Sequence, residues 1–207
     1  MPNMTVRDAL SVAVDKWGGR NFIYTRVKDE FVPKTFRETA NDAKALAEAL
    51  LDLGLGGKHI LIYGENSYEW CLADLAVMGY VGVTVAASAD WKENDLENVV
   101  NIADSECVIY AESGRTTIES MKAKKPEIKY ISMQDDFPVL LERGREIAKR
   151  KQAADKPTAD KQASRDASQM CKIVFTSGTT SASKAVMLSS ENLFFGFESL
   201  YRRAPMG

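Results

Sequence analysis

From residue 59 onward, short apolar runs alternate with stretches in which apolar residues recur at helical spacing. The short runs predict strands over residues 59–63, 81–86, 107–110 and 130–133. The stretches that follow them predict helices over residues 67–78, 94–103, 113–124 and 138–150. Alternating strands and helices require crossover connections, which make neighbouring strands parallel. We therefore expect an α/β fold, with a mainly parallel sheet flanked by helices on both faces.

Two further helices are predicted before residue 59, and each begins with a capping box. Thr5 is followed three positions later by Asp8, and Thr35 by Glu38, so each pair can satisfy free amides at a helix start. Gly54 stands where a helix commonly ends in a left-handed residue. Between the two helices, apolar residues at 22–27 and 31–33 flank a short polar turn. This pattern predicts a β-hairpin.

The distribution of apolar residues divides the chain into three parts. Residues 1–150 carry the helix and strand patterns and are expected to form an N-terminal α/β subdomain. Residues 151–168 contain no large apolar side chain, so they have little surface to bury and are expected to form a polar linker. Residues 169–207 are expected to form a hairpin followed by a helix.

Composition excludes several classes of protein and of site. The 207 residues include 27 Lys and Arg against 29 Asp and Glu, which argues against a nucleic-acid binder. The 3 cysteines are far apart and form no disulfide or metal-binding pattern, and the single histidine excludes a His-rich zinc site. The first residues lack an apolar signal sequence, and no stretch resembles a transmembrane segment. We expect a cytoplasmic protein.

The residues from Thr176 to Lys184 form the segment best suited to chemistry. Six of these nine residues carry hydroxyl groups, one is glycine and one is lysine. Hydroxyl donors, backbone amides and one ammonium group are the parts that hold phosphate oxygens. Composition alone also fits a polar surface loop, because Ser and Thr are common in turns. The segment is not a Walker A loop, since Ser183 precedes the lysine and Ala185 follows it.

The order of residues adds a family resemblance, carried by the stretch I-V-F-T-S-G-T-T-S-A-S-K-A-V-M-L-S-S-E-N-L. It resembles the phosphate-binding signature of the adenylate-forming (AMP-binding) superfamily, whose usual form is T-S-G-T-T-G-x-P-K-G-V-M-L-T-H-x-N. The spacing from Thr176 through Lys184 to Asn192 agrees without a gap. Upstream, Y-G-E-N-S-Y-E-W-C-L-A-D-L-A-V-M-G-Y-V-G-V-T-V is similar to a segment of long-chain fatty-acyl-CoA synthetases. The resemblance covers nearly the whole chain and less than half of a typical member.

This resemblance implies a fold, a reaction and a binding site. The fold would be the N-terminal subdomain of the adenylate-forming fold. The family joins a carboxylic acid to ATP as an acyl-adenylate, in the presence of Mg²⁺, and then transfers the acyl group to a thiol, usually coenzyme A. The resemblance assigns the β- and γ-phosphates of ATP to Thr176, Ser177, Gly178, Thr179, Thr180 and Lys184. It assigns no catalytic residue or metal ligand within this chain, and the identity of the carboxylic acid stays open.

Four positions depart from the usual family signature: Ser181, Ser183, Ala185 and Ser190 stand where glycine, proline, glycine and histidine are common. Fewer glycines restrict left-handed conformations and close backbone approach, and loss of the proline leaves more states to be ordered. We therefore expect weaker or slower binding of ATP than is usual in the family. The family's adenine, magnesium and ribose segments and its C-terminal lysine would all lie beyond residue 207.

Three functional interpretations remain. The first is the N-terminal part of an ATP-dependent acid–CoA ligase, expected to be inactive alone. The second is a non-catalytic module, either a degenerate relative or one half of a split enzyme, which docks another polypeptide such as a complementing C-terminal chain. Self-association is also expected if the sheet leaves apolar surface bare. A generic dinucleotide-binding fold is weaker, because Gly54, Gly56 and Gly57 follow a helix without the required spacing. We assign no chemistry to Asp74 on its helix, and Cys171 is expected to be a buried small residue.

Overall fold

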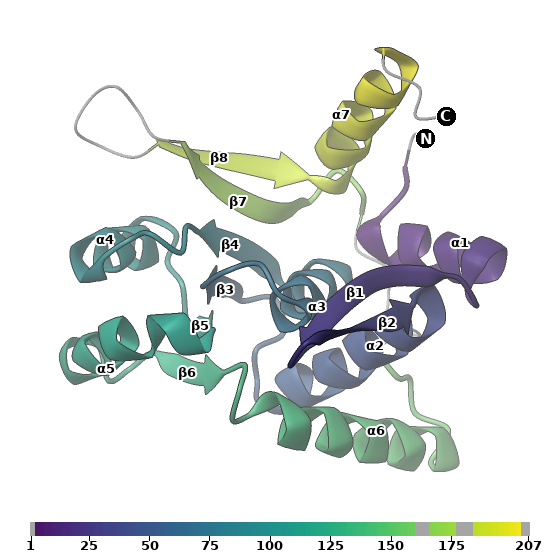
Figure 1. Ribbon diagram of the computed structural model, residues 1–207, viewed down its shortest axis with the longest axis horizontal. Coiled ribbons are helices and arrows are strands. Elements are labelled where there is room, and N and C mark those ends of the chain that lie inside the picture. Colours follow the sequence, from purple (N-terminus) through teal and green to yellow (C-terminus); the bar gives the residue numbers. More distant parts are fainter. Residues whose placement is uncertain (1–2, 160–165, 177–183, 204–207) are drawn as a thin grey trace.

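The computed structural model describes residues 3–159, 166–176 and 184–203. Its centre is a six-stranded sheet with the order β6-β5-β3-β4-β7-β8 (Figure 1). The first five strands in this order are parallel, and β8 is antiparallel to β7. The strands are β3 (His59–Tyr63), β4 (Val83–Ala87), β5 (Cys107–Tyr110), β6 (Lys129–Ser132), β7 (Met170–Thr176) and β8 (Lys184–Ser189). The predicted parallel α/β sheet is confirmed.

Helices cover both faces of this sheet, as the alternating pattern predicts. One face packs against α2 (Phe36–Asp52), α3 (Tyr68–Ala76) and α6 (Phe137–Ala153), and the other against α4 (Glu93–Ile102) and α5 (Arg115–Lys124). Along β3, Ile60 and Ile62 enter the first core, whereas Leu61 and Tyr63 enter the second. Successive strand residues point to opposite faces, so a strand that is buried on both sides is continuously apolar.

The N-terminal elements pack beside the first face. Helix α1 (Val6–Trp17) precedes a two-stranded antiparallel hairpin, β1 (Asn21–Val27) and β2 (Glu30–Thr35), which lies apart from the main sheet (Figure 1). Both predicted capping boxes are present: Asp8 N donates to Thr5 Oγ1 and Glu38 N donates to Thr35 Oγ1, each over 3.1 Å. Gly54 has φ +80°, which confirms the left-handed helix end.

The third predicted helix ends differently from the expected 67–78. Helix α3 ends at Ala76 and continues as a π-helical turn over Val77–Val81. This turn closes when Gly82 N donates to Val77 O over 2.9 Å. A side chain at residue 82 would collide with Lys58 O, so the chain passes close to a neighbouring backbone there. The following strand consequently begins at residue 83 rather than 81.

The segment expected to be a polar linker includes buried residues. Helix α6 continues to Ala153, and Thr158 and Ala159 lie in the interior. The buried carboxylate of Glu48 on α2 accepts hydrogen bonds from Ala159 N and from Lys151 Nζ. Polar anchoring therefore orders part of a segment that has no large apolar side chain. The division at residues 150 and 168 stays a prediction, although β7 belongs to the same sheet as β4.

Candidate phosphate-binding site

The two ends of the predicted phosphate loop face each other across a hairpin. Thr176 is the last residue of β7, Lys184 is the first residue of β8, and the two are register partners. Both are exposed. Ser177, Gly178, Thr179 and Thr180 lie outside the described residues, as do Ser181 and Ser183. The fold thus brings one hydroxyl and one ammonium group of the predicted site together at the base of the loop.

Strand β7 places the loop at the carboxyl edge of the parallel strands. It pairs in parallel with β4, so Thr176 lies at the sheet edge where ligands commonly bind in open α/β folds. Phe175, next to Thr176, packs edge-on against Trp91 with ring centroids 6.0 Å apart. Trp91 O in turn accepts a hydrogen bond of 2.8 Å from Tyr63 Oη. Aromatic packing therefore fixes the N-terminal root of the loop.

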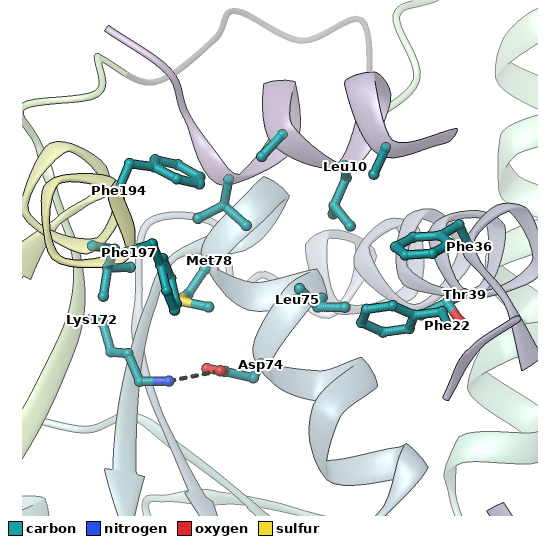
Figure 2. Close-up of a pocket in the computed structure, with 14 residues that line it drawn as sticks. Leu10, Phe22, Phe36, Thr39, Asp74, Leu75, Met78, Lys172, Phe194 and Phe197 are labelled. Carbon is teal, nitrogen blue, oxygen red and sulfur yellow. Dashed lines mark hydrogen bonds and ion pairs between the residues drawn. The ribbon is translucent and has the colours of Figure 1, made fainter. Parts of the chain in front are cut away.

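A buried ion pair also holds β7, and sequence reasoning missed it. Lys172 Nζ lies 2.6 Å from Asp74 Oδ2 on α3, and their side chains are only 14% and 13% exposed (Figure 2). Asp74 is therefore the ionic partner of the strand that leads into the loop, rather than an ordinary helix position. The sequence did contain a signal for this pair: Asp74 is a carboxylate within an apolar helix, and Lys172 is a lysine within an apolar strand. Buried charges require a partner, so each of these residues could have been expected to need one.

After the hairpin, Ser189 and Asn192 cap helix α7 (Ser190–Arg203). Asn192 N donates to Ser189 Oγ over 3.2 Å, and Ser189 N donates to Asn192 Oδ1 over 3.0 Å. This reciprocal arrangement satisfies amides at the helix start. The asparagine of the family signature therefore acts here in helix capping.

Two departures from the family signature have clear structural settings. Ser190, at the place of the common histidine, is buried, and its hydroxyl lies 3.7 Å from Cys171 Sγ. Cys171 is itself buried, as expected. Ala185 is an ordinary strand residue that pairs with Phe175, and it is not among the described residues with positive φ. The backbone at residue 185 therefore needs no left-handed conformation, and the effect of losing this glycine on close approach to phosphate stays a prediction.

Two cysteine thiols in the described ranges are poor nucleophiles. Burial raises the pKa of the Cys71 thiol to about 11 and that of Cys107 to about 12, so both stay protonated near neutral pH. Within the part of the chain that the structure describes, no cluster of three or more His, Cys, Asp or Glu side chains could hold a metal ion. No helix there is long and apolar enough to cross a membrane.

A comparison with models of known protein families shows which family this chain belongs to. The model of the AMP-binding enzymes matches residues 10–206, almost the whole chain and the entire hairpin. The chain belongs to the AMP-binding enzyme family. Its fold agrees with this assignment: the crystal structure of VinN superposes with a TM-score of 0.81 at 19% identity, over 99% of this chain and 50% of VinN. The anthranilate CoA ligase AuaEII, in complex with anthranoyl-AMP, superposes with a TM-score of 0.74 at 17% identity, over 92% of this chain and 35% of AuaEII.

Relatives of this AMP-binding chain are named as fatty-acid ligases. The long-chain-fatty-acid–CoA ligase ACSBG2 of Xenopus laevis is 23% identical over 93% of this chain and 27% of its own length. The ligase FadD15 of Mycobacterium tuberculosis is 28% identical over 83% of this chain and 29% of its own length. The chain thus spans less than a third of these relatives.

Proposed function

We propose that this chain supplies the phosphate-binding part of an ATP-dependent acid–CoA ligase of the fatty-acyl type. One observation carries the proposal. Thr176 and Lys184 are paired across the β7–β8 hairpin, at the base of the loop that contains the family signature. The hydroxyl and ammonium groups point to phosphate chemistry, and the names of the relatives point to long-chain fatty acids.

In this proposal the chain's own residues bind and orient the nucleotide. Lys184 neutralises charge on the β- and γ-phosphates, and Thr176 donates a hydrogen bond from the opposite strand. Ser177, Gly178, Thr179 and Thr180 complete the cradle with hydroxyl and amide donors. Holding these phosphates presents the α-phosphorus to a carboxylate and stabilises the departing pyrophosphate. Packing of Phe175 against Trp91 keeps one root of the loop fixed while this happens.

Other parts of the family reaction need groups beyond those assigned here. ATP and a carboxylic acid are the proposed substrates, Mg²⁺ would accompany the phosphates, and coenzyme A would receive the acyl group. We propose little or no ligase activity for residues 1–207 alone, with a complementing C-terminal polypeptide supplying the remaining groups. Self-association through bare apolar surface is a separate proposal. The 3 cysteines form no disulfide in the structure, which suits a cytoplasmic location.

Isothermal titration with pyrophosphate and with ATP in the presence of Mg²⁺ tests the phosphate site. Pyrophosphate reports on the loop without an adenine pocket. We expect Lys184→Ala to weaken binding of both ligands by about tenfold or more, since a charge-assisted contact contributes about 1.5–3 kcal/mol. Lys149→Ala is the matched control, because Lys149 is an exposed lysine on α6, remote in sequence from the loop.

The comparison of variants gives a clear outcome. Equal affinity of wild-type protein and Lys184→Ala for pyrophosphate would remove the proposed role of the lysine. An equal loss in Lys184→Ala and Lys149→Ala would indicate general charge attraction instead of a built site.

The Ser183→Pro variant tests the departures from the family signature, and we expect it to bind ATP more tightly than wild type, because proline lowers the entropy lost on ordering.

A further inference from the structure

An apolar cavity lies between α1, β1, α2, α3, β7 and α7, on the flank of the hairpin (Figure 2). Its volume is about 520 Å³, within the range of small-molecule sites. Six of the side chains that form its walls are Leu10, Phe36, Leu75, Met78, Phe194 and Phe197. Aliphatic and aromatic walls of this kind favour a ligand with an aliphatic chain.

The cavity opens to solvent instead of being a closed packing defect. Phe197 on α7 lines it and is 64% exposed, and Phe22 on β1 lines it and is 38% exposed. Apolar surface at such a mouth is a marker of binding sites. A ligand that covers these rings would therefore gain hydrophobic free energy that the described residues leave unused.

One side of the cavity is polar, because an ion pair lines it. Asp74 and Lys172 form the ion pair described above, and both line the cavity (Figure 2). Asp74 Oδ1 is buried and has no hydrogen-bond partner among the described residues. Lys172 Nζ donates one hydrogen bond there, to Asp74 Oδ2, and its ammonium lies 5.5 Å from the Trp70 ring centroid. The pair therefore retains acceptor and donor capacity but carries no net charge.

The charge of the pair decides which head group fits. A carboxylate added beside it would leave a net negative charge in a largely buried site, and an ammonium would leave a net positive one; both are costly. A hydroxyl group can donate to the Asp74 carboxylate and accept from the Lys172 ammonium without adding charge. We infer that this cavity binds an uncharged amphiphile: an aliphatic chain with a hydroxyl head group, placed against the Asp74–Lys172 pair.

This site is separate from the phosphate loop and does not depend on the proposed function. Lys172 precedes Thr176 along β7, and the cavity lies between β7 and helices α1, α3 and α7. Neither Thr176 nor Lys184, the two described residues of the proposed phosphate site, lines it. The amphiphile site can therefore fail or succeed independently of pyrophosphate binding.

Three ligands with the same tail test the inference: 1-octanol, octanoate and octylamine. Protein labelled with ¹³C at the methionine methyl groups reports binding through Met78, whose signal is assigned with a Met78→Leu variant. We expect 1-octanol to shift the Met78 signal saturably, with an affinity about tenfold higher than that of either charged ligand, since each net buried charge is disfavoured. No saturable shift, or octanoate binding as tightly as 1-octanol, would overturn the inference.

Further variants locate the site and the source of selectivity. Asp74→Asn leaves Lys172 as the only charge of the pair and should bring octanoate to at least the affinity of 1-octanol, whereas Lys172→Gln leaves Asp74 and should do the same for octylamine. A preserved preference for 1-octanol in both variants would show that the pair is not the head-group site. Leu75→Trp should fill the cavity and abolish the response to 1-octanol. Val139→Trp, at a position 66% exposed on α6, is its matched control and should bind normally. If Leu75→Trp fails to fold, the three-ligand comparison on wild-type protein still decides the inference.

Discussion

The body of the sheet and the β7–β8 hairpin with α7 are built in opposite ways. In the body, every described residue of β5 is buried, and Leu61 and Ile62 at the centre of β3 have no exposed surface. In the hairpin region, Met187 on β8 is 68% exposed and Phe195 on α7 is 74% exposed. Thr176 and Lys184, the two described residues of the proposed phosphate site, thus lie in the more exposed region.

This contrast has a topological cause. Strands β3 and β5 have a neighbour on each side and helices on both faces, whereas β8 is the last strand of the sheet. An edge strand has fewer partners, so its side chains have less surface to pack against. Functional loops are commonly drawn from such low-stability parts of a fold, because they must change conformation on binding.

The largest effect is expected from the same substitution, glycine to alanine, in helices α6 and α7. A Cβ at Gly144 on α6 would lie 1.8 Å from Ala45 O on α2, whereas a Cβ at Gly196 on α7 would have no neighbour within 4 Å. We expect Gly144→Ala to lower the free energy of unfolding by about 3 kcal/mol through overpacking. Gly196→Ala should raise it by about 0.5–1 kcal/mol, because alanine favours a helix over glycine.

Urea denaturation of both variants measures the two effects under the same conditions. Opposite signs would support a tightly packed α2–α6 contact and an open α7. The contrast between the two regions would be wrong if the variants lost similar stability, because α7 would then be packed as closely as α6.

A smaller loss of stability is expected when the hydrogen bonds between Glu48 and the segment that joins α6 to β7 are removed. The Glu48 side chain is 2% exposed and holds Ala159 N and Lys151 Nζ. Glu48→Ala leaves the Ala159 amide without this partner, so we expect a loss of about 2 kcal/mol in the free energy of unfolding. Limited proteolysis near residue 159 should also accelerate. Glu146→Ala, at an exposed position on α6, is the control, and equal proteolysis of the two variants would exclude an anchoring role.

The smallest expected effect is a dependence of stability on pH that arises in the body. Hydrogen bonds from the Thr35 backbone amide and hydroxyl lower the pKa of Glu38 below its ordinary 4.5, and hydrogen bonds from Arg115 lower that of Glu112. A carboxyl group with a lowered folded pKa stabilises the fold above its unfolded pKa, and this contribution is lost as pH falls through the folded pKa. The contribution of these two carboxylates should therefore be lost as pH falls below about 4.5.

Urea denaturation between about pH 5 and pH 3 checks this sign. Glu38→Gln should show a shallower decline than wild type, whereas Lys184→Ala in the hairpin should keep the wild-type slope. A steeper decline in Glu38→Gln would contradict the assignment of the Glu38 pKa shift.

Local sequence signals determined the elements of this protein. Thr5 with Asp8 and Thr35 with Glu38 specify helix starts through hydrogen bonds that span only three residues, so they can be read without a fold. The apolar runs of β3 and β5 specify strands buried on both sides, and hence the parallel sheet. The order of residues from Thr176 to Asn192 specified the family, which the family comparison confirms.

The tertiary structure alone decided which distant residues meet. Lys172 pairs with Asp74 across 98 positions, and Ala159 bonds Glu48 across 111 positions. No local pattern records such pairs, because each depends on how helices dock on the completed sheet. The sequence therefore located the loop with the phosphate-binding signature, whereas the packing of α3 and α7 against β7 created the apolar cavity beside it. Local hydrogen bonding and side-chain periodicity encode the elements, and burial across the whole chain determines the partners.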